Sequence, residues 1–243
     1  MNTPLRLIIH GASGRMGRAL LRLAAEDARL LVVAAVTGSG RAPAEAGDTP
    51  VLAAGALAQA PPFDVAVDFS QPDGFDAVLA LSLARGTALV SGTTGLSAAQ
   101  FAALDAAGRR IPVLWAANFS AGVAVLAELV RQAAAALPGW DADVVEAHHV
   151  HKKDAPSGTA LQLGASVAAG RGRGPAYASL RAGDIVGEHT VQFAGPGERL
   201  ELVHRATNRD IFARGALEAA LRLARLGPGR HEFGRLMLPG GAR

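Results

Sequence analysis

The stretch RLIIHGASGRMG, residues 6–17, decides the first part of the fold. An apolar, strand-like run at 6–10 leads into a glycine-rich turn, and a periodic helical segment at 15–28 follows. A strand, a glycine loop and a helix in this order are typical of dinucleotide binding, because the backbone approaches the pyrophosphate at the helix amino end. The spacing is G-x-x-G-x-x-G, and an ordinary tight turn is the alternative. We expect a coenzyme loop made of Gly11, Ala12, Ser13, Gly14, Arg15 and Met16.

The same alternation continues outward from this stretch. Apolar runs predict strands at 6–10, 30–36, 65–69, 88–91 and 111–116, with helices at 15–28, 75–85 and 98–107. Residues 37–62 are rich in Gly, Ala and Pro and are read as loops around one short strand. Strands that alternate with helices indicate an α/β fold with a parallel sheet covered on both faces.

The pattern changes after Asn118. We expect helices at 122–136 and 159–169, strands at 144–147, 189–193 and 200–205, a connector at 170–175 and a final amphipathic helix at 211–226. This order predicts a separate α+β domain, an open mixed sheet with helices on one face.

Composition removes several function classes. The chain has 243 residues, 50% of them apolar, and no cysteine, which excludes disulfides, zinc–thiolate sites and a cysteine nucleophile. The start lacks the charge and apolar order of a secretory signal, and the chain lacks an apolar run of about 18 residues, so we expect a cytoplasmic protein without membrane contact. The net charge is +3, but its arginines are scattered, which argues against nucleic acid and suits a small anionic ligand.

Lysine usage singles out one place in the chain. Of 24 basic residues only Lys152 and Lys153 are lysines, and an amine, unlike a guanidinium, has a pKa that burial can tune. Three of the seven histidines fall in the same segment, EAHHVHKKDAPSGT at 146–159. Because consecutive histidines on an extended segment point to opposite sides, we expect no metal site here. The alternative is that these histidines only pack, as we assign His10, His204 and His231.

The start of the helix predicted after this segment adds an anion site. Free amides and the helix dipole at Ser157, Gly158 and Thr159 favour a carboxylate, with Lys152 supplying the counter-charge. Pro156 suits the beginning of a helix.

Other dinucleotide enzymes fit less well. Short-chain dehydrogenases need Tyr-x-x-x-Lys, whereas the one tyrosine, Tyr177, is followed four residues later by Arg181. Enzymes that pass through a thioester need the missing cysteine. About 20 residues after Gly17, where an acidic residue would favour NADH, the chain has Thr37. Thr37, Ser39 and Arg41 suit a 2′-phosphate, so either NADPH or NADH is expected, with NADPH favoured.

Taken together, these motifs resemble the dihydrodipicolinate reductase family. The resemblance rests on E-x-H-H-x-x-K-x-D-A-P-S-G-T-A from Glu146, on the glycine loop, and on further strings in the family's order. These strings are VDFS at 67–70, GTTG at 92–95, ANFS at 117–120 and RAGDIVGEH at 181–189. Two departures are Thr37, where many members have an acidic residue, and Gln71, where an Arg is sometimes found.

The resemblance implies hydride transfer from NAD(P)H to a cyclic unsaturated dicarboxylate in diaminopimelate and lysine synthesis. His148 would be a proton donor or acceptor and Lys152 the second proton donor, while His149 and the Gly158–Thr159 amides would hold the substrate. The nicotinamide end would contact Gly92, Thr93, Thr94, Ala116, Ala117, Asn118 and Phe119. Asp68 is otherwise read as a helix cap or turn former, and Glu188 and His189 as domain contacts.

The family fold implies a Rossmann domain over 1–118, rejoined by 209–243, and a substrate-binding and oligomerisation domain over 119–208 that forms a homotetramer. Coenzyme and substrate would meet in a cleft that closes and excludes water. A non-catalytic NADPH sensor and a reductase of another anionic imine are the alternatives.

Overall fold

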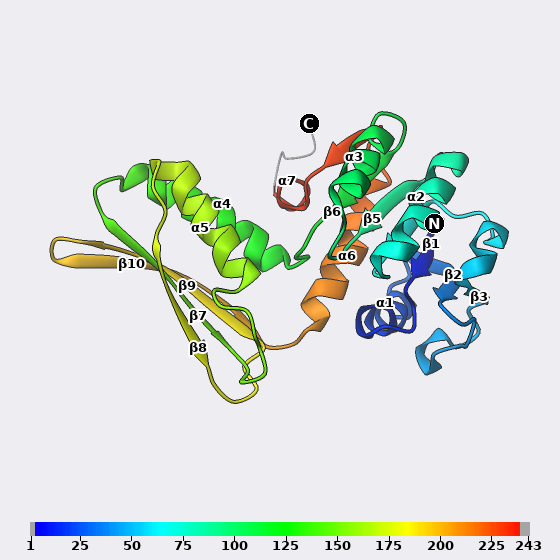
Figure 1. Cartoon of the computed structure of the whole chain (residues 1–243), viewed down its shortest axis with the longest axis horizontal. Helices are drawn as coiled ribbons and strands as arrows, with labels where there is room; N and C mark the ends of the chain where they lie inside the picture. Colours follow the sequence, from blue (N-terminus) through cyan, green and yellow to red (C-terminus); the bar gives the residue numbers. More distant parts are fainter. Residues whose placement is uncertain (1–2, 239–243) are drawn as a thin grey trace. The chain divides into compact units, whose positions relative to one another are not determined.

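The computed structural model describes residues 3–238, which form two compact units. One comprises the described residues up to Phe119 together with those from Phe212 onward, and the other is Ser120–Ile211 (Figure 1). No helix in this part of the chain has the length and apolar character that crossing a bilayer requires.

A parallel sheet forms the centre of the first unit. Its strands are ordered β11-β6-β5-β4-β1-β2-β3, and the order reverses direction between β1 and β4. The strands are β1 (Leu5–His10), β2 (Leu30–Thr37), β3 (Val51–Ala53), β4 (Val65–Asp68), β5 (Ala88–Ser91), β6 (Pro112–Trp115) and β11 (Gly229–His231). The predicted Rossmann-type α/β fold is confirmed.

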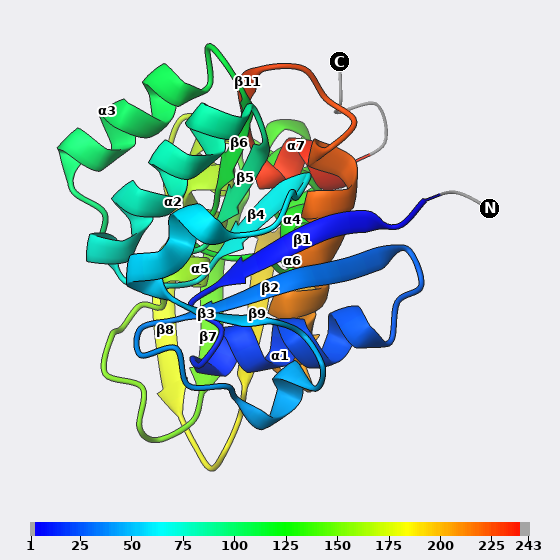
Figure 2. The same ribbon diagram turned by 90° about the vertical axis from the view of Figure 1, so that its right-hand side faces the viewer.

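Helices cover both faces of this sheet (Figure 2). Those on one face are α2 (Pro72–Arg85) and α3 (Ala98–Ala107), with the short 3₁₀ helix η2 (Ala54–Gln59). On the other face lie α1 (Arg15–Ala25) and α6 (Asp210–Leu223), and Arg29 in the turn after α1 forms an ion pair of 3.4 Å with Glu218 of α6. The remaining elements are η1 (Ala44–Ala46) and α7 (Phe233–Met237).

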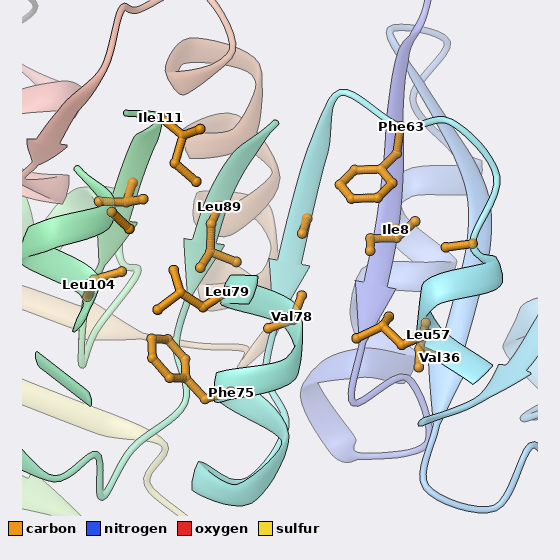
Figure 3. Close-up of a cluster of buried hydrophobic side chains, with 14 of the residues drawn as sticks. Ile8, Val36, Leu57, Phe63, Phe75, Val78, Leu79, Leu89, Leu104 and Ile111 are labelled. Carbon is orange, nitrogen blue, oxygen red and sulfur yellow. The ribbon is translucent and has the colours of Figure 1, made fainter. Parts of the chain in front are cut away.

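Strand alternation builds the core of the first unit. Along β1, Ile8 points into the cluster under α2 and α3, while its neighbours Leu7 and Ile9 are buried against the opposite face. Figure 3 shows Phe75 and Leu79 of α2 in this cluster, between the helix and the strands. Near-continuous apolar strands are what a sheet buried on both faces requires.

The second unit is a mixed sheet with helices on one face. Its strands are β7 (Asp141–His148), β8 (Ala176–Arg181), β9 (Gly187–Gly195) and β10 (Glu198–Ala206), ordered β10-β9-β7-β8, with only β7 and β8 parallel. The helices α4 (Ala121–Ala136) and α5 (Gly158–Arg171) pack on it through Val130 and Leu163, which meet Val144 and Phe193 (Figure 1). The predicted α+β unit is confirmed.

Five elements escape the sequence prediction, namely β8, β11, α7 and the 3₁₀ helices η1 and η2, and the helices α1 and α6 both end earlier than expected. The prediction has no strand at β8, because its residues are exposed and show no apolar alternation. It also lacks β11 and α7, which have three and five residues. Helix α1 ends at Ala25 rather than 28, because Asp27 binds Arg29 in a turn instead of continuing the helix.

Candidate active site

The glycine loop after β1 has the shape that dinucleotide binding needs. Gly11 has φ +79°, and a Cβ there would overlap the Phe69 carbonyl, so only glycine fits. A Cβ at Gly17 would overlap the Gly11 carbonyl, which lets α1 pack closely against the loop. Gly14 is the N-cap of α1 and has no side-chain cap, so the first-turn amides of this helix are open to a ligand.

A cavity of about 390 Å³ lies beside this loop, at the carboxyl ends of β1, β2 and β4. This is the switch point of the sheet, where open α/β folds bind ligands. The cavity is lined by His10, Gly11, Ser13, Gly14, Val36, Thr37, Gly38, Ala54, Phe69, Ser70, Gln71 and Gly74. Of the predicted loop residues, Ala12 is fully buried, Met16 is half-buried and Arg15 is exposed.

Thr37 shapes the far side of this cavity. It is buried, and its hydroxyl donates to the Arg41 carbonyl at 3.3 Å, so its polar group already has a partner in the protein. The Arg41 amide in turn donates to Ser39 Oγ at 3.3 Å, and the Arg41 side chain is exposed. The turn therefore presents Ser39 and Arg41 at the end of β2.

Asp68 forms a buried polar network at the ends of three strands. It accepts from Ser91 Oγ at 2.8 Å and Thr93 Oγ1 at 2.7 Å, and His10 Nδ1 lies 2.9 Å away. Burial works against the charge, but hydrogen bonds from His10, Ser70 and Thr93 outweigh it and lower the pKa of Asp68. Asp68 also accepts from the Ser70 amide, as a turn former does, but the helix-cap reading is wrong, since α2 has Gln71 at its N-cap.

The predicted nicotinamide residues follow β5 and β6. Thr93 is buried in the Asp68 network and its carbonyl accepts from Trp115 Nε1 at 2.7 Å, while Thr94 is exposed. Phe119 is 2% exposed, and its ring packs 5.4 Å from Phe69 and 5.1 Å from Phe233. Gly92, Ala116 and Asn118 are half-buried and Ala117 is exposed.

The second unit places a carboxylate directly behind the predicted catalytic histidine. Glu146 is 1% exposed, and His148 Nδ1 lies 2.5 Å from its Oε2. Arg181 donates to both carboxylate oxygens, at 2.8 and 2.9 Å, and the Ser157 amide donates to Oε1 at 3.2 Å. Burial opposes ionisation of Glu146, yet hydrogen bonds from Arg181, Ser179 and His148 lower its pKa to about 2.

Electrostatics around His148 favour its neutral form. Burial lowers the pKa of His148, and the positive charges of Lys152 and Arg181 lower it further, against the opposing effect of Glu146. Lys152 Nζ forms an ion pair with Asp154 at 2.9 Å, and its side chain is 21% exposed, whereas Lys153 is exposed. The charge of Lys152, the predicted proton donor, thus influences the protonation of His148.

His149 points to other partners than His148. Its Nε2 accepts from Arg209 at 3.1 Å, so the two adjacent imidazoles bind different groups. Within residues 3–238 no three His, Cys, Asp or Glu side chains are arranged to hold a metal ion.

The amino end of α5 lies next to this cluster. Ser157 is the N-cap and accepts from the Ala160 amide at 3.2 Å, so its hydroxyl is engaged within the protein. Gly158 is exposed and Thr159 half-buried in the first turn. Pro156 lies one residue before the N-cap rather than inside the helix.

Family models match both halves of the chain. The model described as dihydrodipicolinate reductase, N-terminus, matches residues 5–119, and the one described as dihydrodipicolinate reductase, C-terminus, matches residues 122–236. The chain belongs to the dihydrodipicolinate reductase family. It is therefore an oxidoreductase, as the resemblance implied.

Curated relatives agree with this family over nearly the whole length. A 4-hydroxy-tetrahydrodipicolinate reductase of Stenotrophomonas maltophilia (strain K279a) is 64% identical over 97% of this chain and 98% of its own. One from Xanthomonas campestris pv. campestris (strain B100) is 61% identical over 97% of this chain and 99% of its own.

A solved structure shows the same fold. The dipicolinate-bound dihydrodipicolinate reductase from Paenisporosarcina sp. TG-14 matches with a TM-score of 0.80 and 21% identity, over 95% of this chain and 98% of that one. A C. glutamicum DAP dehydrogenase in complex with DAP matches with a TM-score of 0.62 and 14% identity, over 98% and 97%.

The sequence predicted no role for Glu146 or Arg181 in this reductase, and His189 was read as a contact between the domains. His189 is instead buried inside the second unit, with its ring 5.1 Å from that of His148 and its Nε2 3.1 Å from Ser157 Oγ. Burial lowers the pKa of His189 to about 4. One signal was available: Glu146 and His148 lie two residues apart on a strand, which places both on one face.

Proposed function

We propose that the chain catalyses the reaction for which its relatives are named, the reduction of 4-hydroxy-tetrahydrodipicolinate to tetrahydrodipicolinate with loss of water, in diaminopimelate and lysine synthesis. The observation that carries the proposal is the combination of His148 and Lys152 beside the amino end of α5. A cyclic dicarboxylate with a conjugated imine needs both anion binding and protonation, and this cluster offers groups for both.

The coenzyme fits the first unit. The tight, Cβ-intolerant loop at Gly11 and the cavity at the sheet's switch point are suited to a pyrophosphate and its ribose. We assign the coenzyme to the loop residues Gly11–Met16 and to Thr37, and its nicotinamide end to Gly92–Thr94 and Ala116–Phe119. When bound, NADPH or NADH supplies the hydride.

The substrate's carboxylates fit the second unit. The first-turn amides of α5 at Gly158 and Thr159 point the positive end of the helix dipole at an anion. Lys152 and the His149–Arg209 pair add donors. Ser157 acts as the cap that holds this helix end, because its hydroxyl already bonds Ala160 and His189.

Protonation completes the reaction. Hydride addition to the conjugated imine leaves negative charge on the ring, and a proton must neutralise it. Lys152 is the proton donor in this proposal. The lowered pKa of His148 favours its neutral form, whereas a bound dianion favours its protonation, so His148 becomes a second donor when substrate binds.

NADPH is the preferred coenzyme in this proposal. Ser39 and Arg41 follow β2 where a 2′-phosphate would lie, and Thr37 orders their turn through the Arg41 carbonyl. We expect kcat/KM to be higher with NADPH than with NADH, and Arg41→Ala to reduce that ratio. A ratio well below one in the unmodified enzyme would contradict this preference.

The test of the function is oxidation of NADPH with the freshly formed condensation product of aspartate semialdehyde and pyruvate. Lys152→Ala should lower kcat at least 10²-fold, because it removes the proton donor. The matched control is Lys153→Ala, since Lys153 is the exposed neighbour. Coenzyme binding without turnover would instead indicate a sensor, and turnover only with another imine would indicate a different reductase.

We also propose a homotetramer formed through the second unit. The sheet face opposite α4 and α5 exposes Leu180 by 56% and Val203 by 40%, and β-strand pairing places both on the side of Val145 and Ala147. Leu180→Arg should dissociate the assembly in analytical ultracentrifugation.

Two further expectations remain predictions: a cytoplasmic location, and closure of a cleft when coenzyme and substrate are both bound. Identical X-ray scattering profiles with and without both ligands would contradict the closure.

A further inference from the structure

Glu146 lies at a buried position where an ionised carboxylate is energetically unfavourable. It is on β7 with Ala142, Val144 and His148, on the face that packs under α5, and is 1% exposed. An ionised side chain at such a position is tolerated only when its hydrogen bonds are satisfied.

Both carboxylate oxygens of Glu146 have hydrogen-bond partners. Oε1 accepts from Arg181 Nη2 and the Ser157 amide, and Oε2 accepts from Arg181 Nη1 and faces His148 Nδ1. Because an ionised carboxylate can only accept, Nδ1 of His148 must carry the proton. The other ring nitrogen, Nε2, is then unprotonated in the neutral imidazole.

Arg181 extends the same arrangement to the lysine. Besides Glu146, its guanidinium donates to the carbonyls of Asp154 at 2.6 Å and of Lys152 at 3.3 Å. The loop that carries Lys152 is therefore tied by its backbone to the carboxylate that orients His148. One guanidinium thus connects the two groups on which protonation depends.

The surroundings of the ring leave room for Nε2. A Cβ at Gly187 would lie 3.0 Å from Nε2, so a glycine borders that nitrogen. The titratable and charged groups that face the ring are Glu146 on β7, Arg181 on β8, His189 on β9 and Lys152 on the following loop.

We propose that Glu146 and Arg181 are positioning residues for the reduction. Glu146 holds His148 in the tautomer that presents Nε2 to the substrate, and Arg181 keeps Glu146 ionised while fixing the Lys152 loop. This inference rests on the proposed function, because it gives His148 and Lys152 their tasks. When the dianionic substrate binds, Glu146 stabilises the imidazolium, and Arg181 compensates the carboxylate in either state of the ring.

The first test is Glu146→Gln, which keeps the shape of the side chain and removes its charge. We expect kcat to fall at least about 10-fold, because either tautomer of His148 can then form. The limb of the kcat/KM profile that reports His148 should move to lower pH, since Glu146 raises that pKa. Arg181→Lys should also lower kcat, because an ammonium cannot reproduce the forked contact.

The matched control is Glu128→Gln, which removes a carboxylate that Arg131 of the same helix, α4, binds at 2.6 Å. It should leave kcat and the pH profile unchanged. A Glu146→Gln protein with unchanged kcat and an unchanged pH profile would overturn the proposal.

A measurement on the unmodified protein covers the case in which Glu146→Gln fails to fold. Heteronuclear NMR of the imidazole nitrogens should show His148 protonated at Nδ1 near neutral pH. Protonation at Nε2 alone would overturn the proposal. This readout needs no turnover, so it separates an error about Glu146 from an error about the proposed reaction, which the NADPH assay detects.

Discussion

Each unit of this reductase buries one carboxylate against a histidine, and the two pairs differ in how the charge is compensated. In the first unit, Asp68 is fully buried and lies 2.9 Å from His10 Nδ1. In the second, Glu146 is 1% exposed and lies 2.5 Å from His148 Nδ1. Among the residues that the structure describes, an arginine, Arg181, binds the carboxylate of the second pair but not that of the first.

The difference indicates that the Asp68–His10 pair is a structural clamp, whereas the Glu146–His148 pair can take part in proton transfer. Within residues 3–238, the partners found for Asp68 are the imidazole, two hydroxyls and one backbone amide, so its charge depends on His10 and on neutral donors. The clamp joins the ends of β1, β4 and β5, where the Gly92–Thr94 loop begins. Next to Glu146 the guanidinium is permanent, so His148 can gain or lose a proton without leaving the carboxylate uncompensated.

The largest effect that would test this comparison is on stability of the first unit. Asp68→Asn removes the charge that His10 and two hydroxyls surround, and breaking a buried pair in this way should cost about 3 kcal/mol. The free energy of unfolding is measured by urea denaturation, and amide hydrogen exchange in β1 and β4 then localises the loss.

The chain offers a matched control on the same two strands. Arg6 and Asp64 pair at 2.7 Å at the other end of β1 and β4, with side chains 43% and 35% exposed. Asp64→Asn should cost no more than about 1 kcal/mol. Equal losses for the two substitutions would show that Asp68 is no more than an ordinary strand-end ion pair.

The second unit should lose stability in acid through its buried imidazoles. His189 has its pKa lowered to about 4 by burial, against 6.5 in the unfolded chain. The unfolded chain therefore binds this proton first, so the contribution is complete above pH 6.5 and is lost as pH falls towards 4. Between pH 7.5 and 5 we expect a loss of about 2 kcal/mol.

The substitution His189→Gln isolates this contribution. The variant should lose less stability than the unmodified protein between pH 7.5 and 5, measured by amide exchange in β7 and β9. At pH 7.5 the His189 imidazole is neutral in both the folded and the unfolded chain. The difference in stability between the variant and the unmodified protein at that pH therefore measures only lost packing. The same pH dependence in both proteins would assign the acid sensitivity to other groups.

The contrast between the units also explains what the sequence could predict. In most of the first unit, local alternation was enough: the helix at Ala98–Ala107 and the strand at Ala88–Ser91 were both predicted correctly, because each carries its own apolar pattern. The strand β11 depends on pairing with β6, and its three residues carry no pattern of their own.

The site of the second unit was predictable only along one strand and its loop. His148, Lys152 and the start of α5 come from one continuous segment, so its composition drew attention to them. Arg181 and His189 join them only through sheet register, in which Arg181 pairs with His148 and His189 with Glu146. Strand β8 is exposed and has no apolar alternation, so this register could not be read from the sequence.

The smallest expected effect compares two serine caps. Ser97 begins α3 in a capping box with Gln100, is exposed and lies in the first unit, whereas Ser157 begins α5 and is buried against His189 and Glu146. Ser97→Ala should cost about 1 kcal/mol of stability without changing the kinetics. Ser157→Ala should cost a similar cap energy and also raise KM for the substrate, because α5 presents the anion-binding amides. If both variants change only unfolding, the amino end of α5 is a structural cap and the substrate's carboxylate binds elsewhere.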